Sequence, residues 1–230
     1  MYKVIGKGMI AKAFMAISEK QPNCIVFASG VSDSSCIDKD NFIREKKLLI
    51  NELENSKNDL PFIYFSTCSI YDEQLSNSPY VIHKKNMEEI VYKYSNGIVF
   101  RLPQIAGPNS PPKTLLQTIR TSLINAKPLE IWTKAKRNIL DIKDARDIII
   151  HLLNKQNIDF KCLNIANKRS HSMIEIVKTF EKVLDKKIHK IFLNKGSQYN
   201  IDVSYIDQLI EFQKLNDNEY LDRIILRYYI

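Results

Sequence analysis

The sequence predicts an α/β protein with a mostly parallel sheet. Short apolar segments alternate with helical patterns along most of the chain, which is typical of strands linked by crossover helices. A glycine-containing turn joins the first strand, Val4–Ile5, to the first helix. A second apolar run, Phe62–Phe65, ends in two hydroxyl residues. With 230 residues, the chain can form a main domain with a smaller lobe.

The composition indicates a globular protein rather than a membrane-spanning or secreted one. The hydrophobic content of 44% and the charged content of 26% are those of an ordinary globular protein. No run of about 18 apolar residues is present, so we expect no transmembrane helix. The N-terminal residues lead directly into a strand, which leaves no room for a signal peptide and predicts a cytoplasmic protein.

The net charge and the positions of the cysteines indicate which ligands to expect and whether a metal site or disulfides are present. The net charge of +8 favours an anionic ligand, such as a small molecule that carries phosphate. The lysines are spread along the chain rather than gathered on one element, so we do not expect a nucleic-acid partner. Cys24, Cys36, Cys68 and Cys162 are scattered without a C-x-x-C pair, so the sequence indicates neither a metal site nor a disulfide framework.

The first turn has the pattern GxGxxA, formed by Gly6, Gly8 and Ala11, between a strand and a helix that we expect to reach about residue 20. Gly6 permits a tight turn, Gly8 lets a pyrophosphate approach the backbone, and Ala11 allows the helix to pack closely on the strand. The helix N-terminus offers amides and a partial positive charge to phosphates. The turn therefore predicts a dinucleotide site.

The next strand, Cys24–Gly30, ends in small residues. A dinucleotide fold usually places an acid about 20 residues after the glycine turn, where it holds the adenosine ribose. Here Ser29 and Gly30 occupy the strand end, and no acid does. Asp38 then begins a predicted helix that runs to about Asn55 and leads into the strand at 62–67.

Residues 62–84 carry the candidate chemistry. The strand delivers Thr67 to its carboxyl end, and Ser78–Pro79 opens a helix that carries Tyr80 and Lys84 on one face. Lowering a tyrosine pKa from about 10 by about 3 units requires roughly 4 kcal/mol, which a nearby ammonium and a cationic cofactor ring can supply. Thr67 would hydrogen-bond the substrate oxygen whose proton Tyr80 gives or takes. A Tyr-x-x-x-Lys pair is also common as an exposed helix pair, but its place after a Ser-Thr strand end favours the functional interpretation.

The second half predicts further short elements. We expect a strand at 98–102, a turn at 103–108, a helix at 111–126 that starts with two prolines, and short strands at 129–132 and 139–142 around a basic loop at 134–137. A helix at 145–154, a strand at 162–166, a capping-box helix from Ser172 to Leu184, a strand near 188–193 and one or two short helices ending near Tyr228 follow.

These motifs, in this order, resemble the extended short-chain dehydrogenase/reductases, the family of nucleotide-sugar epimerases, dehydratases and reductases. The resemblance covers nearly the whole chain and rests on GKGMIA, FASGVS, STCSIY, the Tyr80/Lys84 pair, FRLPQIAGP, RNILDIKDA and LNIA. It implies a Rossmann-like domain over 1–108 and 143–167 for cofactor and catalysis. It also implies a small α+β substrate lobe over 109–142 and 168–230.

The resemblance also implies roles for residues. The catalytic set would be Thr67, Tyr80 and Lys84, and the last two would also contact the cofactor, which would be NAD or NADP. The other cofactor-binding residues would be Gly6, Gly8, Met9, Ile10, Ala11, Ala28, Ser29, Gly30 and Pro103. Substrate contacts would come from Thr67, Cys68, Ser69, Gln104 and Arg137. Two of these residues also have a purely structural explanation. Pro103 would then only shape the turn, and Arg137 would be a solvated charge in a loop.

The sequence departs from the family pattern in three places. The glycine turn is one residue shorter than GxxGxxG. The strand at 24–29 resembles the fourth strand of the family, so the second and third strands, which cradle adenosine, are expected to be missing. In an alternative alignment it is the second strand, with Ser29 near a 2′-phosphate, and two strands are still missing. The loop from Thr67 to Tyr80 is short, and Cys68 and Ser69 replace the Asp-Glu pair of the dehydratases, so we do not expect dehydration chemistry.

The sequence therefore predicts an NAD(P)-dependent reductase or epimerase that acts on a nucleotide-activated keto-sugar in surface polysaccharide synthesis. The alternative is a non-catalytic descendant of the fold that binds a nucleotide-sugar or a protein, and RNA binding by a basic relative is a third interpretation. The resemblance also predicts a homodimer formed through the helices at 38–55 and 79–95.

Overall fold

The computed structural model describes residues 2–17, 23–56, 60–155, 158–215 and 217–230. The chain divides into two compact units, which are described separately. Unit 1 comprises residues 1–102 and 145–165, and unit 2 comprises residues 103–144 and 166–230. The segment 103–108, which we expected in the cofactor domain, falls in unit 2.

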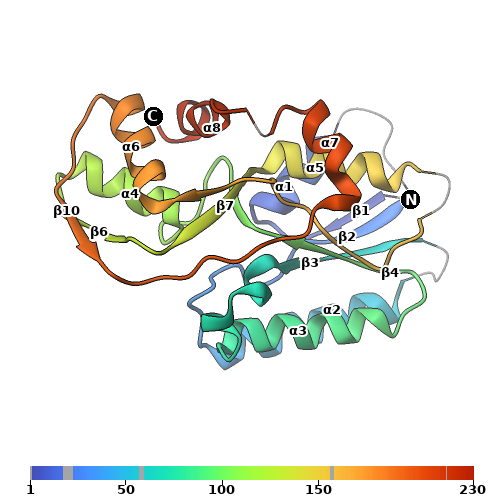
Figure 1. The fold of residues 1–230 in the computed structure, drawn as a ribbon. Coiled ribbons are helices and arrows are strands. Elements are labelled where there is room, and N and C mark those ends of the chain that lie inside the picture. The colour runs from blue at the N-terminus through green and yellow to red at the C-terminus, as the bar shows by residue number, and fades with distance from the viewer. Residues whose placement is uncertain (1, 18–22, 57–59, 156–157, 216) are drawn as a thin grey trace. The chain divides into compact units, whose positions relative to one another are not determined.

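Unit 1 is built on a five-stranded parallel sheet (Figure 1). Its strands, in spatial order, are β1 (Tyr2–Ile5), β2 (Cys24–Phe27), β3 (Phe62–Thr67), β4 (Gly97–Leu102) and β8 (Cys162–Asn164). Each neighbouring pair runs parallel. The expected Rossmann-like α/β class is therefore confirmed. Among the described strands, β1 pairs only with β2 and forms one edge of the sheet.

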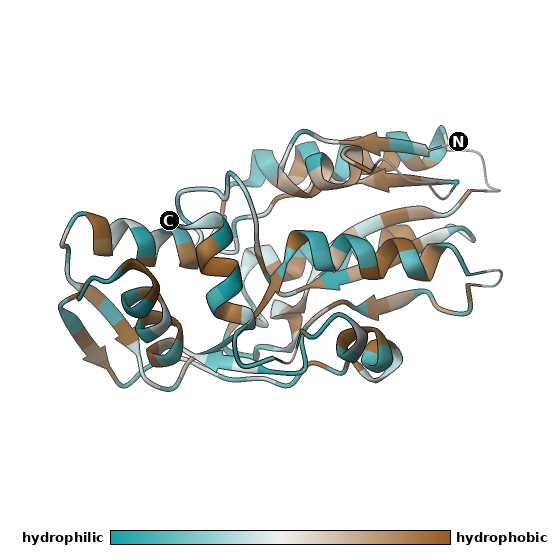
Figure 2. Ribbon diagram, turned by 90° about the horizontal axis from the view of Figure 1, so that it is seen from above, coloured by the Kyte–Doolittle hydropathy of each residue, from teal (hydrophilic) through white to brown (hydrophobic). Residues whose placement is uncertain are grey.

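Helices cover both faces of this sheet. The helices α2 (Lys39–Glu54) and α3 (Pro79–Tyr92) lie on one face, and α1 (Met9–Met15) and α5 (Ile142–Leu153) lie on the other (Figure 1). The strands β2 and β3 are buried along their whole length, as expected for parallel strands covered on both sides. Figure 2 shows the corresponding concentration of hydrophobic residues in the strands.

The core beneath α2 and α3 joins the two helices to three central strands. It consists of buried side chains from all five elements: Ile25, Phe27, Leu49, Leu53, Phe62, Tyr64, Met87, Val91 and Val99. The expected helix starts are confirmed: the Asp38 side chain accepts a hydrogen bond from the Asp40 amide, and the Ser78 side chain accepts one from the Val81 amide. These caps fix where α2 and α3 begin.

Unit 2 contains two small sheets. The strands β5 (Gln104–Ala106), β7 (Lys136–Asp141) and β9 (Ser170–Ser172) form one, and β6 (Leu129–Trp132) and β10 (Lys190–Leu193) form the other. The helices are α4 (Leu115–Ile124), α6 (Met173–Leu184), α7 (Asp207–Phe212) and α8 (Tyr220–Tyr228). The predicted capping box of α6 is confirmed, since Ser172 and Glu175 bond each other's backbone amides.

Several predicted boundaries were wrong. The helix α1 ends at Met15, short of residue 20, and residues 18–22 of that expectation lie outside the described residues. The helix α4 begins at Leu115 rather than at Pro111, because a proline disfavours helical backbone in the residue before it and Pro111 precedes Pro112. The predicted turn at 103–108 contains β5, and Lys136 and Arg137 of the predicted basic loop lie in β7. The strand β9 was not predicted.

Membrane-spanning helices and metal clusters are both absent from the described residues. No helix in these ranges is long and apolar enough to cross a membrane. Within the same ranges, no group of three or more His, Cys, Asp or Glu side chains is placed to hold a metal ion.

Candidate active site at the carboxyl ends of β1, β2 and β3

The glycine turn after β1 lies against the end of β2. Gly6 has a φ of +130°, a conformation that favours glycine, and a Cβ on it would lie 2.3 Å from the Ala28 carbonyl oxygen. By contrast, a Cβ on Gly8 would meet nothing within 4 Å. Gly8 is the N-cap of α1, so the open space lies beside backbone amides at the start of a helix. The turn can therefore accept a ligand close to its backbone.

The segment 28–30 connects this turn to α2 and α3. The Ala28 amide donates to the Ile5 carbonyl at 2.8 Å. The Ser29 carbonyl accepts from the Arg44 guanidinium at 3.2 Å. A Cβ on Gly30 would lie 2.8 Å from the Lys84 nitrogen. The structure thus brings the predicted residues Ala28, Ser29 and Gly30 beside Gly6 and Lys84.

Thr67 and Tyr80 form the second part of the site. Both side chains are buried, Thr67 at the end of β3 and Tyr80 in the first turn of α3. The two hydroxyls are hydrogen-bonded to each other. Burial raises the pKa of Tyr80 above its ordinary value, the Thr67 bond opposes this, and the negative charge of Glu45 adds to it. Tyr80 is therefore a phenol at neutral pH.

Lys84 is held inside the protein rather than at its surface. It is 3% exposed, and its ammonium donates to Glu45 Oε1 at 3.0 Å, to the Tyr64 hydroxyl at 3.0 Å and to the Phe65 carbonyl at 3.4 Å. An ammonium has three N–H donors, and these three acceptors account for them. Burial lowers the pKa of Lys84, and Glu45 opposes that shift. The nitrogen lies 5.9 Å from the centroid of the Tyr80 ring.

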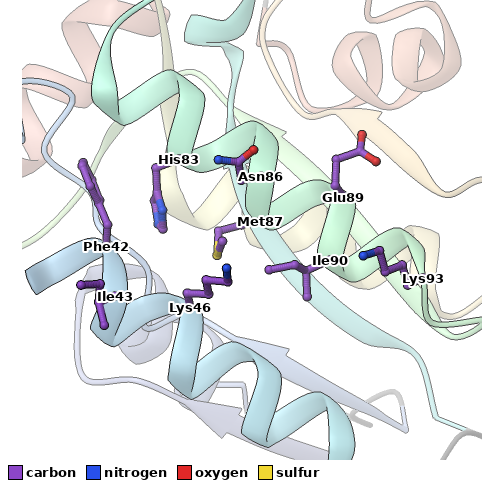
Figure 3. Close-up of a pocket in the computed structure, with 9 residues that line it drawn as sticks. All are labelled: Phe42, Ile43, Lys46, His83, Asn86, Met87, Glu89, Ile90 and Lys93. Carbon is purple, nitrogen blue, oxygen red and sulfur yellow. The ribbon is translucent and has the colours of Figure 1, made fainter. Parts of the chain in front are cut away.

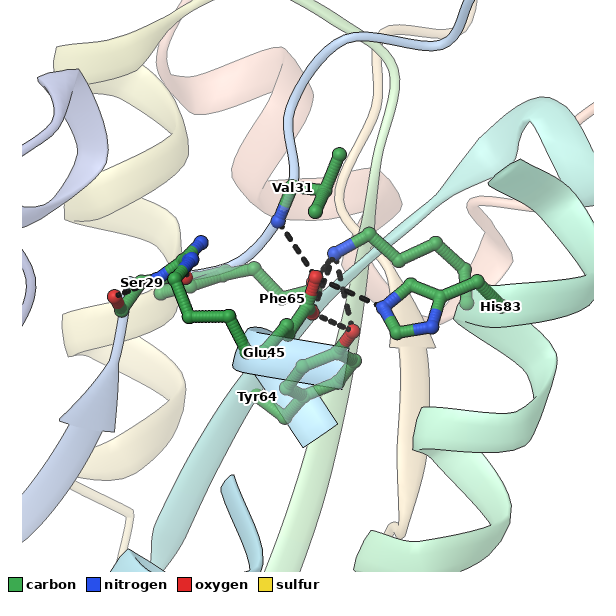
Figure 4. Close-up of polar contacts among 8 residues, drawn as sticks. Ser29, Val31, Glu45, Tyr64, Phe65 and His83 are labelled. Carbon is green, nitrogen blue, oxygen red and sulfur yellow. Dashed lines mark hydrogen bonds and ion pairs between the residues drawn. The ribbon is translucent and has the colours of Figure 1, made fainter. Parts of the chain in front are cut away.

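Glu45 is the centre of this network (Figure 4). The residue is fully buried, and besides Lys84 it accepts hydrogen bonds from the Tyr64 hydroxyl at 2.6 Å and the Val31 amide at 2.6 Å. Its Oε2 also lies 3.0 Å from His83 Nε2. Burial alone would raise the pKa of Glu45, but Lys84 and the hydrogen bonds hold it at about 2. Glu45 is therefore a carboxylate at neutral pH.

Glu45 was not identified as a site residue from the sequence, although its spacing from two leucines on the same helix indicated that it would be buried. Glu45 precedes Leu49 and Leu53 by four and eight residues, so the three share one helix face, and both leucines are in the core. A carboxylate on such a face must be paired when the helix packs. The partners Tyr64 and His83 gave no signal of their own, because a buried tyrosine and a helix histidine are ordinary core residues.

Ser66 is the first residue of the Ser-Thr strand end, and the sequence assigned it no role. Its hydroxyl is buried and, within the described chain, makes no hydrogen bond. Buried hydroxyls without a partner are rare, and this one lies directly before Thr67 at the end of β3.

Cys68 and Ser69 follow Thr67 in a short 3-10 helix, Cys68–Tyr71. The Cys68 thiol is fully buried and lies 3.4 Å from the Arg101 carbonyl, to which it donates. The Ser69 amide donates to Thr67 Oγ1 at 3.1 Å. These contacts position Thr67, and a substrate contact by either residue stays a prediction.

A second buried ion pair supports the same strand ends. Arg101 on β4 binds Glu88 on α3 through two hydrogen bonds, of 2.9 Å and 2.6 Å. Arg101 also donates to the Tyr71 hydroxyl at 3.0 Å, and that hydroxyl donates to Asn164 Oδ1 at 3.0 Å. The network ties α3 to β4 and β8, and it does not include Lys84.

The remaining predicted residues, Pro103, Gln104 and Arg137, belong to unit 2. Gln104 pairs with Ile139 between β5 and β7, and the Arg137 side chain donates to the Lys136 carbonyl at 2.8 Å. Their contacts with cofactor or substrate stay predictions.

A surface groove of about 440 Å³ lies between α2 and α3 (Figure 3). Phe42, Ile43 and Lys46 line it from α2. Five residues line it from α3, and the residue after that helix completes the lining: His83, Asn86, Met87, Glu89, Ile90 and Lys93. His83 also stacks on Phe42, with ring centroids 4.5 Å apart. The groove thus adjoins the Glu45 network from the outer side of the two helices.

Comparisons with known proteins agree with this fold. The model of the NAD dependent epimerase/dehydratase family matches residues 11–166. A UDP-glucuronic acid 4-epimerase from Bacillus cereus, solved with UDP-glucuronic acid and NAD, is 21% identical with a TM-score of 0.68; the match covers 94% of this chain and 79% of that chain.

Two further solved structures are similar. RMD from Pseudomonas aeruginosa, complexed with NADPH, is 14% identical with a TM-score of 0.70, over 90% of this chain and 92% of that chain. UDP-glucose 4-epimerase from Thermus thermophilus, complexed with NAD, is 14% identical with a TM-score of 0.66, over 95% of this chain and 80% of that chain. None of the curated proteins compared with the chain matches it.

Proposed function

Because the chain belongs to the NAD-dependent epimerase/dehydratase family, we propose that it is an NAD(P)-dependent reductase or epimerase acting on a nucleotide-activated keto-sugar. The observation that carries this proposal is the meeting of Thr67, Tyr80 and Lys84 at the carboxyl ends of parallel strands, where ligands bind in open α/β sheets. The similar structures solved with NAD, with NADPH and with UDP-glucuronic acid support the ligand classes.

The residues that would hold the cofactor lie along the strand ends. The glycine turn, with its open space at Gly8, would take the pyrophosphate, and Tyr80 would contact the end of the cofactor that carries the nicotinamide. The nicotinamide, when bound, supplies or accepts a hydride. Met9, Ile10, Ala11, Ala28, Ser29, Gly30, Lys84 and Pro103 complete the proposed cofactor set.

The acid–base step would run through two hydroxyls. Thr67 hydrogen-bonds the substrate oxygen and orients it toward Tyr80, whose hydroxyl it already contacts. Tyr80 gives its proton to that oxygen when a keto carbon is reduced, or takes it when an alcohol is oxidised. Because both hydroxyls are buried, the proton passes within a site that holds little water.

The sheet order supports the proposal that two adenosine-binding strands are missing. In the usual dinucleotide fold, the second strand lies on the outer side of the first, and the fourth lies between the first and the fifth. Here β2 lies between β1 and the strand that carries Thr67. This favours β2 as the fourth strand of the family and speaks against the alternative alignment with Ser29 near a 2′-phosphate.

Gln104 and Arg137 of unit 2 are proposed to contact the nucleotide-sugar. Thr67, Cys68 and Ser69 of unit 1 are the other proposed substrate-binding residues. A role in surface polysaccharide synthesis and a cytoplasmic location belong to the proposal. We also propose a homodimer through α2 and α3, which is supported by the apolar groove between them and by Ile43, which is 49% exposed.

The test of the proposal is Tyr80→Phe in the purified protein, assayed with NADH or NADPH and a set of keto-sugar nucleotides. We expect loss of turnover of about 10²-fold or more, since Tyr80 would be the only proton donor to the substrate oxygen. Equal turnover of the variant and the wild type would contradict the assignment.

The arrangement of Lys84 favours a second candidate, a non-catalytic descendant that binds a nucleotide-sugar or a protein. The donors of Lys84 are directed to protein acceptors, and β1 is an edge of the described sheet. Calorimetric titration with NADH and with NADPH separates the candidates. If neither binds in the presence of a nucleotide-sugar, the second candidate is favoured.

A further inference from the structure

The Glu45–Lys84 ion pair changes what the Tyr80/Lys84 pair can do. A lysine near a tyrosine stabilises the phenolate only through its positive charge. Here Glu45 places a full negative charge 3.0 Å from that ammonium, in a region with little solvent. The carboxylate therefore offsets the stabilisation that the ammonium would give a phenolate at Tyr80, and its charge raises the pKa of Tyr80.

The contacts fix this arrangement from three elements. Glu45 comes from α2, Lys84 and His83 come from α3, and Tyr64 comes from β3. The backbone amide of Val31, in the loop after β2, also donates a hydrogen bond to Glu45. Because each carboxylate oxygen has at least two partners, Glu45 cannot move away from Lys84 without leaving several buried groups unpaired.

The position of Gly30 makes the close approach possible. A Cβ there would lie 2.8 Å from the Lys84 nitrogen and 2.9 Å from Glu45 Oε1. Glycine leaves the space that both charged groups occupy. The ion pair therefore depends on Gly30, in the loop after β2, as well as on residues of the two helices.

The other titratable groups around Tyr80 reinforce this effect. Burial and the charges of Glu45, of Asp33 in the loop after β2, and of Cys68 after β3 raise its pKa, and the hydrogen bond from Thr67 lowers it. Glu88, one turn beyond Lys84 on α3, raises the pKa of Lys84, although it is itself paired with Arg101.

We propose that Glu45 is a positioning residue that offsets the charge of Lys84 and keeps Tyr80 as a phenol in the protein without cofactor. This inference rests on the proposed function, in which Tyr80 gives or takes the proton of the substrate oxygen.

The experiment is a titration of Tyr80 in the full-length protein without cofactor, by NMR of ¹³Cζ-labelled tyrosine. The chain has 11 tyrosines, and Tyr80→Phe assigns the signal. In the wild type we expect Tyr80 to titrate above pH 10, the ordinary value being about 10. In Glu45→Gln we expect its midpoint to fall by about one pH unit or more, because Lys84 then acts without a counter-charge.

Two further variants complete the design. In the double variant Glu45→Gln/Lys84→Met, the midpoint should return toward the wild-type value, because both charges are gone. Glu52→Gln removes a carboxylate from the same helix, where it pairs with the surface residue Lys3, and should leave the midpoint unchanged.

Several outcomes overturn the proposal. It falls if wild-type Tyr80 titrates near neutral pH, a measurement that stands even where Glu45→Gln does not fold. It also falls if Glu45→Gln and the wild type share one midpoint. If Tyr80 titrates as expected but Tyr80→Phe keeps full turnover, the proposed function fails instead, so the two failures are distinguishable.

Discussion

Gly30 and Lys84 approach each other so closely that a Cβ on Gly30 would lie 2.8 Å from the lysine nitrogen. We therefore expect Gly30→Ala to lower the free energy of unfolding by about 1–3 kcal/mol, because neither Lys84 nor Glu45 has free space to move into. Urea denaturation measures this. A variant as stable as the wild type would show that the network can rearrange.

Gly8→Ala is the matched comparison. A Cβ at Gly8 meets nothing within 4 Å, so we expect the stability to change by less than about 1 kcal/mol. The same methyl group would occupy the space proposed for the pyrophosphate, so the affinity for NADH or NADPH should fall by about tenfold or more. Unchanged affinity, measured by calorimetry, would place the phosphates elsewhere.

Tyr64→Phe tests the network without changing its charge. The Tyr64 hydroxyl donates to Glu45 and accepts from Lys84, so its removal leaves two buried charged groups each one partner short. We expect a loss of about 1–3 kcal/mol in the free energy of unfolding, measured in urea at neutral pH. A loss of a few tenths would mean that water replaces the hydroxyl.

Glu45 also predicts how stability depends on pH. Its pKa is lowered from the ordinary 4.5 to about 2 in the folded protein. The unfolded chain therefore binds this proton more tightly, and the stabilisation, full above about pH 4.5, is lost as the pH falls toward 2. The contribution is about 3 kcal/mol.

Urea denaturation between pH 7 and pH 3 checks this prediction. Glu45→Gln should be less stable at neutral pH and should lose less stability on acidification than the wild type. Glu52→Gln should keep the slope of the wild type. Parallel curves for Glu45→Gln and the wild type would show that Glu45 does not titrate in this window.

The proposed dimer is tested on the outer side of α2. Ile43→Lys places a charge in the groove between α2 and α3, and we expect the dimer to dissociate at least about tenfold more readily, measured by light scattering across a concentration series. Ile37→Lys is the control, since Ile37 is 76% exposed and does not line the groove. A wild type that is monomeric at all concentrations would contradict the dimer.

The parallel α/β class was predictable because it rests on local pattern, and so was the placement of Thr67 at the end of a strand and of Tyr80 and Lys84 on one helix. Apolar runs predicted β2 and β3, and Asp38 and Ser78 predicted the starts of α2 and α3. By contrast, β5 and β9 are three residues long and exist only through pairing with β7. No local propensity specifies such strands, because their stability comes from a partner far along the chain.

The pairing of Lys84 shows the same limit within the site. The spacing of Tyr80 and Lys84 placed both on one helix face. It could not show that Glu45, 39 residues earlier, would bind the ammonium. Only the packing of α2 beside α3 brings the two charges together.

The buried Glu45 network also bears on how this protein could evolve. A substitution that frees Lys84 to act on Tyr80 or on a ligand also removes a contact that joins α2, β3 and α3, so gains in basicity at Tyr80 would be coupled to losses in stability. Replacing the charged pair by apolar residues of similar volume can avoid that loss, but it gives up the lysine. Mutational paths to a more basic Tyr80 should therefore pass through compensating substitutions in the core before Glu45 changes.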